Sequence, residues 1–218
     1  FFNLNSGRDK NADYQITIFS KDQATKNKKF DMLKKSEKRI ISIFNASRNE
    51  FECVEGWNEN VFFDDDENLI DKICKYFKTN KDFLFVLRVH PNLKFLINTQ
   101  NKNIKKLESN KNLIIIYPNE KISSYELMRL SETIITFGST IGVEATYMGK
   151  KSISIGDSLY KELNCTYNPK SFIELINQIQ NKNLKNKPKK STLKYGFYIL
   201  NNGNNFRLTK KIILKYSI

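Results

Sequence analysis

The sequence predicts an α/β protein with a doubly wound, Rossmann-like parallel sheet, helices on both of its faces, and further C-terminal helices. Short apolar segments rich in β-branched residues alternate with helix-like segments for about 140 residues, the pattern of a parallel sheet with helical crossovers. Polar side chains follow several of the apolar segments, at the strand ends where such sheets bind ligands. Hydrophobic residues make up 39% of the 218 residues, so a substantial core is expected.

Three regions are expected along the chain. Residues 1–38 predict a linker, a helical lead-in or the remnant of an N-terminal domain, because a candidate strand at 14–19 precedes a charged stretch with too few apolar residues for a core element. Residues 39–190 predict the α/β domain. Residues 191–218 predict a C-terminal helical segment.

The elements of the α/β domain follow from hydrophobic pattern and capping residues. Five buried strands are expected at Arg39–Phe44, Phe83–Val89, Leu113–Tyr117, Thr133–Phe137 and Lys151–Gly156. The acidic run Asp64–Glu67 precedes apolar residues at three- and four-residue spacing, which predicts a solvated helix N-terminus. Another helix is expected over about Leu93–Leu107. Capping boxes predict two further helix starts, at Ser123 with Glu126 and at Ser171 with Glu174, the second helix running to about Gln180.

The stretch Thr133–Lys150 is the most informative part of the chain. Its apolar run is followed by Gly138, which permits a sharp turn, and by Ser139 and Thr140, which fall where a helix N-cap belongs. Free backbone N–H groups and the helix dipole favour an anion at such a junction. Glu144 can share a helix face with Thr140. The stretch therefore predicts a phosphate at the turn and a sugar hydroxyl at Glu144, the alternative being an ordinary cap and a helix carboxylate.

A second cluster of chemistry is expected after the Phe83–Val89 strand. Arg88 and His90 point the same way in an extended strand, and a guanidinium beside an imidazole suits a phosphate. Pro91 stops the strand and holds His90, the single histidine of the chain, at its tip. The alternative is that His90 is an ordinary polar residue of a strand-end loop. Other polar residues expected at the same edge of the sheet are Asn45, Ser47, Asn119 and Glu120.

Charge and composition narrow the function classes. The formal net charge of +14 has three interpretations: a solvated surface that reflects composition, attraction to an anionic membrane, or nucleic-acid binding. The three cysteines are widely spaced, which predicts neither a zinc site nor a disulfide framework and favours a reducing cytoplasm. The sequence has no Walker loop, dinucleotide fingerprint or serine-hydrolase elbow, so the enzymes that use those motifs are disfavoured.

Four segments resemble the C-terminal nucleotide-binding half of GT-B glycosyltransferases, above all those of bacterial capsule and surface polysaccharide biosynthesis. They are R-V-H-P-N, S-S-Y-E-L-M, T-F-G-S-T-I-G-V-E-A-T-Y-M-G-K-K-S-I-S-I-G and Y-K-E-L. They are also similar to the His-Pro and Ser/Thr motifs of bacterial sialyltransferases, Kdo transferases and CDP-glycerol glycerophosphotransferases. The early N-A-S-R-N-E-F-E resembles the loop after the first strand of that domain. The resemblance covers about Arg39 to Phe206, and Lys151 stands where the usual G-K-P turn has proline.

The resemblance implies roles for the residues singled out above. In those families the His-Pro histidine and the Ser/Thr hydroxyls hold the donor phosphates, which implies His90, Ser139 and Thr140 here, with His90 as the catalytic residue. An acidic residue of the following helix holds the ribose, which implies Glu144, and the base is expected near Tyr117–Glu120. The donor is expected to be a nucleotide-sugar, with a CMP or CDP type favoured, and no metal or other cofactor. The N-terminal domain that carries the catalytic base and binds the acceptor is expected to be missing from this chain.

The expected function is that of a donor-binding domain which transfers a sugar from a nucleotide-sugar to a capsular or other surface glycan. The acceptor is expected to be a glycan or a lipid-linked glycan, the location the cytoplasm, and a peripheral position on the anionic inner membrane is a further expectation. One alternative is a sugar-nucleotide epimerase of the GT-B fold. Another is a basic, non-catalytic domain that binds nucleic acid or serves as a scaffold; it leaves S-T-I-G-V-E-A at a strand end without a role.

Overall fold

The computed structural model describes residues 27–201 except 52, 53 and 60. Five strands form one sheet: β1 (Arg39–Phe44), β2 (Phe83–Arg88), β3 (Leu113–Ile116), β4 (Thr133–Phe137) and β5 (Lys151–Ile155). Their order is β3-β2-β1-β4-β5 and every neighbouring pair is parallel, which confirms the predicted fold class. The bounds of β1 and β4 are those predicted, and the other three strands end one residue earlier. The candidate strand at 14–19 lies outside the described residues.

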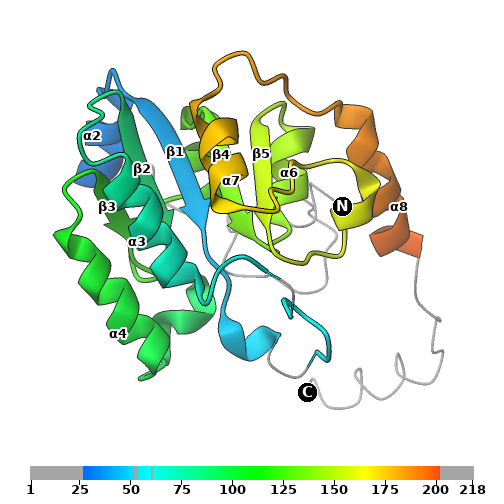
Figure 1. Ribbon diagram of the computed structural model, residues 1–218, viewed down its shortest axis with the longest axis horizontal. Helices are drawn as coiled ribbons and strands as arrows, with labels where there is room; N and C mark the ends of the chain where they lie inside the picture. Colours follow the sequence, from blue (N-terminus) through cyan, green and yellow to red (C-terminus); the bar gives the residue numbers. More distant parts are fainter. Residues whose placement is uncertain (1–26, 52–53, 60, 202–218) are drawn as a thin grey trace, which may run out of the picture.

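Helices cover both faces of the sheet (Figure 1). One face packs against α3 (Asp66–Tyr76), α4 (Thr99–Lys106) and α7 (Phe172–Gln180), and the other against α2 (Lys28–Lys34), α5 (Ser124–Leu130) and α6 (Ile141–Tyr147). Strand side chains alternate between the two cores: Ile41 and Ile43 of β1 join the first, whereas Ile40 and Phe44 join the second. The result is the three-layer arrangement that a buried parallel sheet requires.

The prediction of one continuous helix over about Leu93–Leu107 is wrong. A 3-10 segment, η3 (Pro91–Phe95), comes first, and α4 begins only at Thr99. Leu96 is extended, with φ −88° and ψ 127°. The side chain of Asn98 then accepts a hydrogen bond from Asn101 N at 2.9 Å, so a new N-cap separates the two segments. A short η4 (Leu107–Ser109) closes α4.

Both predicted capping residues start helices. Ser123 Oγ accepts from Glu126 N at 3.4 Å, and Ser171 Oγ accepts from Glu174 N at 3.2 Å. The Glu174 carboxylate accepts from the backbone N of Lys170, one residue before the cap. The remaining elements are η2 (Arg48–Glu50), η5 (Lys161–Leu163), η6 (Lys189–Thr192) and α8 (Leu193–Asn201), the described part of the expected C-terminal helices.

The described part of the segment before β1, residues 27–38, contributes to the core, although no core element was expected there. Phe30 and Leu33 of α2 are 4% and 0% exposed and pack with the residues of α5. Lys29 Nζ also reaches across to donate to Ile115 O and to the Glu120 carboxylate, each at 2.8 Å. The helix is short and charged, so its few apolar residues were a weak sequence signal. The domain boundaries themselves stay predictions.

None of the helices within residues 27–201 combines the length and the apolar character needed to span a bilayer.

Candidate functional site

The carboxyl ends of the strands meet at one edge of the sheet, and β1 and β4 are neighbours at its centre. The chain leaves β1 toward α3 on one face and leaves β4 toward α6 on the other. Two neighbouring strands whose connections leave toward opposite faces form a topological switch point. A crevice opens there at the carboxyl ends of the strands, and α/β proteins bind their ligands in it. Asn45 and Ser47 follow β1, and Ser139 and Thr140 follow β4, so these four predicted residues flank the crevice.

The turn after β4 is built around Gly138. Its φ is +74°, and a Cβ at this position would lie 2.6 Å from the carbonyl oxygen of Asp157. Only glycine meets both conditions without strain. Ser139 Oγ accepts weakly from Ile141 N at 3.4 Å, whereas Thr140, at the N-cap position, makes no side-chain capping bond. Both hydroxyl residues are half-buried, so the turn keeps polar groups within reach of solvent.

His90 lies after β2, on the other side of β1. Its backbone N donates to Asn45 Oδ1 at 2.9 Å, which joins the ends of β1 and β2. Its Nδ1 accepts from Asn92 N at 3.3 Å and lies 3.7 Å from Glu50 Oε1. Pro91 begins η3, so the strand ends before the imidazole as predicted. Burial lowers the pKa of His90, and the Glu50 carboxylate opposes that shift.

Arg88, the last residue of β2, contacts the loop that follows β3 at the same edge of the sheet. Its side chain is buried, its Nη1 donates to Tyr117 O at 2.7 Å, and burial lowers its pKa while Glu120 opposes the shift. Glu120 Oε2 accepts from Tyr117 N at 2.7 Å and from Lys29 Nζ at 2.8 Å. The structure thus brings Arg88 together with the predicted Tyr117–Glu120 loop, in which Asn119 is exposed. Because β2 ends at Arg88, the strand alternation used to pair it with His90 does not extend that far.

Glu144 lies on the buried face of α6. The carboxylate residue is 3% exposed, and its Oε2 accepts a hydrogen bond from the hydroxyl of Tyr125 in α5. Glu144 N donates to Thr140 O at 3.1 Å, so these two residues share one helix face as predicted. Tyr125 belongs to the segment S-S-Y-E-L-M, but its contact with Glu144 links two elements and was not foreseen.

Tyr160 is a site residue that sequence reasoning missed. It is 1% exposed, and its hydroxyl donates to the backbone carbonyl of Ser139. The same oxygen lies 3.4 Å from Thr136 Oγ1 and 3.5 Å from Ser154 Oγ. Burial raises its pKa to about 12, so the phenol stays protonated. Its segment, Y-K-E-L, was part of the resemblance, and that was the available signal.

The loop after β1 folds back over the β4 and β5 ends, which was also not foreseen. Asn58 N donates to Asp157 Oδ2 at 2.8 Å, and Asp157 N donates to Asn58 Oδ1 at 2.7 Å. Between these anchors and β1, the ring of Trp57 stacks on Phe51, with centroids 4.7 Å apart. Trp57 Cζ2 lies 3.4 Å from the point that a Cβ on Gly138 would occupy. The only tryptophan of the chain therefore lies against the predicted phosphate turn.

The acidic run at the start of α3 is not solvated as expected. Asp65 caps the helix, but Asp66 and Glu67 are 7% and 2% exposed. Asp66 Oδ2 accepts from Ala46 N at 3.1 Å. Burial, and next the charge of Glu67, raise the pKa of Asp66 to about 7. Burial also raises the pKa of Glu67, against the opposing charge of Arg48.

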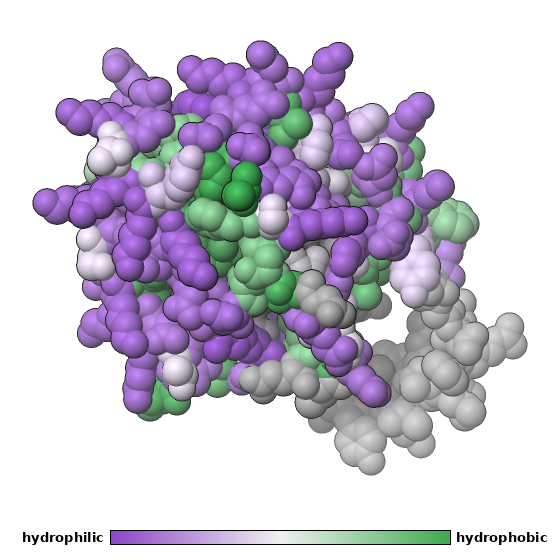
Figure 2. All heavy atoms as spheres, in the orientation of Figure 1, coloured by the Kyte–Doolittle hydropathy of each residue, from purple (hydrophilic) through white to green (hydrophobic). Residues whose placement is uncertain are grey.

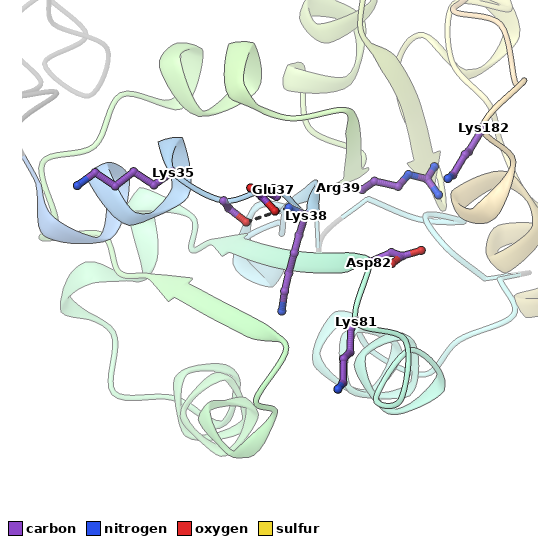
Figure 3. Close-up of a pocket in the computed structure, with 8 residues that line it drawn as sticks. Lys35, Glu37, Lys38, Arg39, Lys81, Asp82 and Lys182 are labelled. Atoms are coloured by element: carbon purple, nitrogen blue, oxygen red, sulfur yellow. Dashed lines mark hydrogen bonds between the residues drawn. The ribbon is translucent and has the colours of Figure 1, made fainter.

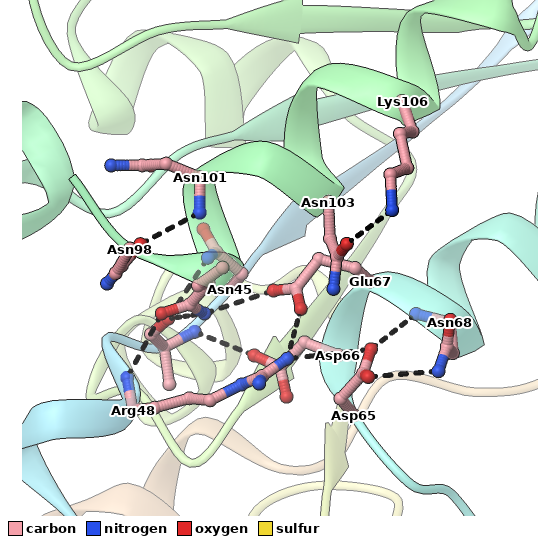
Figure 4. A network of polar contacts seen from close by, with 12 residues as sticks. Asn45, Arg48, Asp65, Asp66, Glu67, Asn68, Asn98, Asn101, Asn103 and Lys106 are labelled. Atoms are coloured by element: carbon pink, nitrogen blue, oxygen red, sulfur yellow. Dashed lines mark hydrogen bonds and ion pairs between the residues drawn. The ribbon is translucent and has the colours of Figure 1, made fainter. Parts of the chain in front are cut away.

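These carboxylates hold the loop that carries Asn45 and Ser47 (Figure 4). Glu67 pairs with Arg48 Nη2 and accepts from Gln100 Nε2 at 3.0 Å. Gln100 in turn donates to Ala46 O at 3.0 Å and accepts from Arg48 N at 3.3 Å. The network ties three elements to the β1 end and so gives the acidic run a positioning role. In the described part of the chain, no group of three or more metal-ligating side chains comes together.

Comparison with known proteins gives limited matches. No family model matches the chain. Protein FixF from Sinorhizobium fredii is 29% identical over 93 residues, which make up 43% of this chain and 21% of that protein. The chain thus spans about a fifth of the length of this curated relative.

Solved structures resemble the chain at low sequence identity. The KpsC beta Kdo 2,7 transferase of Thermosulfurimonas dismutans is 13% identical, with a TM-score of 0.45 over 72% of this chain and 45% of that one. A putative UDP-N-acetylglucosamine 2-epimerase from Listeria monocytogenes is 17% identical, with a TM-score of 0.43 over 84% of this chain and 40% of that one. The chain spans less than half the length of either protein.

Proposed function

We propose that this chain is the donor-binding half of a GT-B glycosyltransferase, which transfers a sugar from a nucleotide-sugar to a capsular or other surface glycan. One observation carries the proposal. His90 after β2 and Ser139–Thr140 after β4 lie on the two sides of β1, at the edge where the chain direction changes. These are the residues that the resemblance assigns to the donor phosphates, and this edge is where the fold class binds ligands.

The proposed chemistry is electrostatic. Departure of the nucleotide leaves negative charge on its phosphate, and donors fixed in advance around that charge lower the barrier. His90 is the proposed catalytic residue. Protonation on donor binding would end the weak bond that its Nδ1 accepts from Asn92 N, and the imidazolium would neutralise the leaving phosphate while Ser139 and Thr140 donate hydrogen bonds. The backbone of His90 is held by Asn45, and that of Ser139 by Tyr160, so both are placed before the donor arrives. A metal ion is not required for this step.

The other predicted residues receive supporting roles in the proposal. Arg88 is buried and bonded to Tyr117 O, so we assign it to holding the loop that would face the base. Glu144 would hold the ribose, and the ribose hydroxyl would add to or replace the hydrogen bond from Tyr125. The cytidine donor stays the favoured one, on the His-Pro resemblance alone.

Binding of the donor half can be measured without an acceptor. Isothermal calorimetry with CMP, CDP, UDP and GDP should show saturable binding of at least one nucleotide to the wild type. The variant His90→Ala should bind that nucleotide roughly 10-fold or more weakly, because one charge-assisted contact is worth about 1.5–3 kcal/mol. Thr79→Ala is the matched control, since Thr79 is exposed and lies at the opposite end of β2.

Equal affinity of the wild type and His90→Ala would remove the phosphate role of His90. Failure of every nucleotide to bind the wild type would remove the proposed function itself. If a nucleotide binds, incubation with the corresponding nucleotide-sugar alone separates the transferase from the epimerase, since only an epimerase converts that sugar without an acceptor.

We further propose that the protein works in the cytoplasm and takes a lipid-linked or glycan acceptor near the inner membrane. Its cysteine usage favours a reducing compartment. Of the described cysteines, Cys74 and Cys165 are both free and buried. The net charge of +14 favours attraction to an anionic leaflet.

A further inference from the structure

The amino ends of the strands form the second edge of the sheet, opposite the candidate donor site. Because all five strands are parallel, the residues that precede them gather there. Lys38 and Lys150 come directly before β1 and β5, and Lys81 and Lys111 stand two residues before β2 and β3, so four of the five strands are preceded by a lysine at this edge. Ligands of this fold class bind at the other edge, so the donor site gives no reason for this charge.

Three hollows lie along this edge, and neighbouring hollows share a lining residue. The largest, of about 740 Å³, is lined by the residues before β1 and β2 together with Lys182 (Figure 3). Lys182 also lines the second hollow, and Lys150 lines the second and the third. Together the three hollows are lined by ten basic residues and three acidic ones. We call this surface the basic edge.

One of the three acidic residues is already neutralised within the protein. Glu132 accepts from Arg39 Nε at 2.8 Å and from Arg39 Nη2 at 2.6 Å, and Lys151 Nζ lies 3.7 Å away. Arg39 accordingly lowers the pKa of Glu132. Lys151 Nζ is further satisfied by Asn181 O at 2.8 Å. The charges of Arg39, Glu132 and Lys151 largely neutralise one another, so these residues contribute little to the attraction of an outside partner.

Lys189 of the basic edge places its Nζ 4.0 Å from the centroid of the Tyr147 ring. Five other lysines of the basic edge are exposed, and none of them forms an ion pair with a described residue: Lys35, Lys38, Lys81, Lys182 and Lys185. They come from the end of α2, the starts of β1 and β2, and the connector after α7. Hydrophilic side chains project along the corresponding upper margin of the molecule in Figure 2. The free charge is therefore spread along a rim and is not focused into one small pocket.

The residue types at this rim favour a lipid surface over nucleic acid. All five free cations are lysines, which act as point charges and do not form the planar forks with which arginine recognises individual phosphates and bases. The two larger hollows have no aromatic lining residue among those described, so they offer bases no stacking platform. Lysines near an anionic leaflet gain affinity from the surface potential without specific geometry.

We propose that the basic edge docks on an anionic phospholipid bilayer, with the five lysines facing the headgroups and the donor site at the far edge of the sheet. The inference deepens the proposed function and rests on it for the lipid-linked acceptor.

Vesicle co-sedimentation of the full chain tests the docking. The wild type should sediment with vesicles of equal parts phosphatidylglycerol and phosphatidylcholine and stay in solution with phosphatidylcholine alone. The variant Lys35→Gln/Lys38→Gln/Lys182→Gln/Lys185→Gln should bind the anionic vesicles more weakly, by roughly 5-fold for each lysine and about 10²-fold or more in all. Raising the salt concentration should weaken wild-type binding, since surface charge is screened.

The matched control removes four exposed lysines elsewhere, Lys72→Gln/Lys102→Gln/Lys105→Gln/Lys170→Gln. It has the same net charge as the test variant and should sediment nearly as well as the wild type. Equal losses in both variants would mean that net charge alone attracts the protein, and the basic edge would lose its role. Wild-type binding to phosphatidylcholine alone, or binding of single-stranded RNA in place of vesicles, would also overturn the proposal.

Nucleotide calorimetry on the same variants separates the two proposals. The test variant should keep the nucleotide affinity of the wild type, because the changed lysines lie at the opposite edge of the sheet. Loss of vesicle binding with intact nucleotide binding in the test variant would therefore support the membrane role of the basic edge. Absence of nucleotide binding in the wild type would contradict the proposed donor site and leave the test of the basic edge unaffected.

Discussion

The hydroxyl of Tyr160 donates a hydrogen bond to the backbone carbonyl of Ser139, and through it the segment after β5 holds the turn after β4. The Tyr160 side chain is buried and its hydroxyl stays protonated. Ser139 and Thr140 are proposed phosphate ligands, and the carbonyl that Tyr160 holds belongs to the peptide unit between them, so the orientation of the Thr140 N–H depends on Tyr160.

Tyr160→Phe should therefore destabilise the protein and weaken nucleotide binding together. Loss of the hydroxyl removes one of the two hydrogen bonds to the Ser139 carbonyl, which still accepts from Gly142 N at 3.0 Å, so the cost should be about 0.5–1.5 kcal/mol. Urea denaturation gives the free energy of unfolding, and calorimetry gives the affinity. Tyr198→Phe is the control, because Tyr198 is 54% exposed and its change should stay within about 0.5 kcal/mol. An unaltered stability of Tyr160→Phe would contradict the role of the hydrogen bond.

Gly142→Ala should destabilise the protein, although alanine in a helix normally gains about 1 kcal/mol over glycine. A Cβ at Gly142 would overlap the Tyr160 hydroxyl and lie 3.0 Å from Thr136 Oγ1. In the Tyr160→Phe background part of the overlap disappears, so the cost of Gly142→Ala should be smaller there. A double-mutant cycle in urea measures the difference, and strict additivity of the two changes would argue against the contact.

Asp66→Asn should flatten the dependence of stability on pH. The folded state raises the pKa of Asp66 from 3.8 to about 7, so between these values the folded protein holds a proton that the unfolded chain releases. Stability is thus lost as pH rises through this window, by about 1.4 kcal/mol per pH unit at most. Unfolding free energies at pH 5 and pH 7.5 should diverge less in Asp66→Asn than in the wild type. The exposed neighbour variant Asp64→Asn should behave as the wild type does.

Nucleotide binding should raise the pKa of His90. Burial holds that pKa below its usual value, whereas an adjacent phosphate favours the charged imidazolium. Affinity should correspondingly fall as pH rises through the pKa. Because His90 is the only histidine, its NMR titration is unambiguous. Glu50→Gln removes the carboxylate 3.7 Å from Nδ1 and should lower the pKa further, whereas Glu59→Gln, in the same loop, should not.

Trp57 should report donor binding by its fluorescence. Its indole lies against the Gly138 turn and stacks on Phe51, and the chain has no other tryptophan. Titration with a bound nucleotide should change the emission saturably, with the dissociation constant that calorimetry gives. Phe51→Leu should alter the starting emission and cost about 0.5–1.5 kcal/mol of stacking. An emission that nucleotide leaves unchanged would place the phosphate away from this turn.

The strands could be predicted because their signal is local. Continuous β-branched runs such as Thr133–Phe137 suit a strand buried on both faces, and the structure gives this strand the predicted bounds. The sharp turn at Gly138 could also be predicted, since glycine adopts a positive φ without the steric cost that other residues have. The prediction of one helix over Leu93–Leu107 was wrong because the apolar spacing continues across the N-cap at Asn98. Periodicity alone does not reveal a break between two helical segments.

The contacts around the site could not be predicted because they join distant segments. Tyr160 meets Ser139, and Asp66 meets Ala46, only once the sheet has assembled. A run of acidic residues is usually solvated, and its burial here follows from partners such as Arg48, whose position depends on the fold.

The central position of β1 has a consequence for how the chain assembles. Ile41 pairs with Phe85 on one side and with Thr133 on the other, partners about 40 and about 90 residues later in the sequence. None of the five described strands pairs with a neighbour through a local hairpin, so each of their pairings must first close a long loop, which makes folding slow. During synthesis one side of β1 stays unpaired until β4 emerges from the ribosome. For that interval the nascent chain carries an open apolar strand edge, the feature most prone to aggregation, and a chaperone has its clearest reason to bind there.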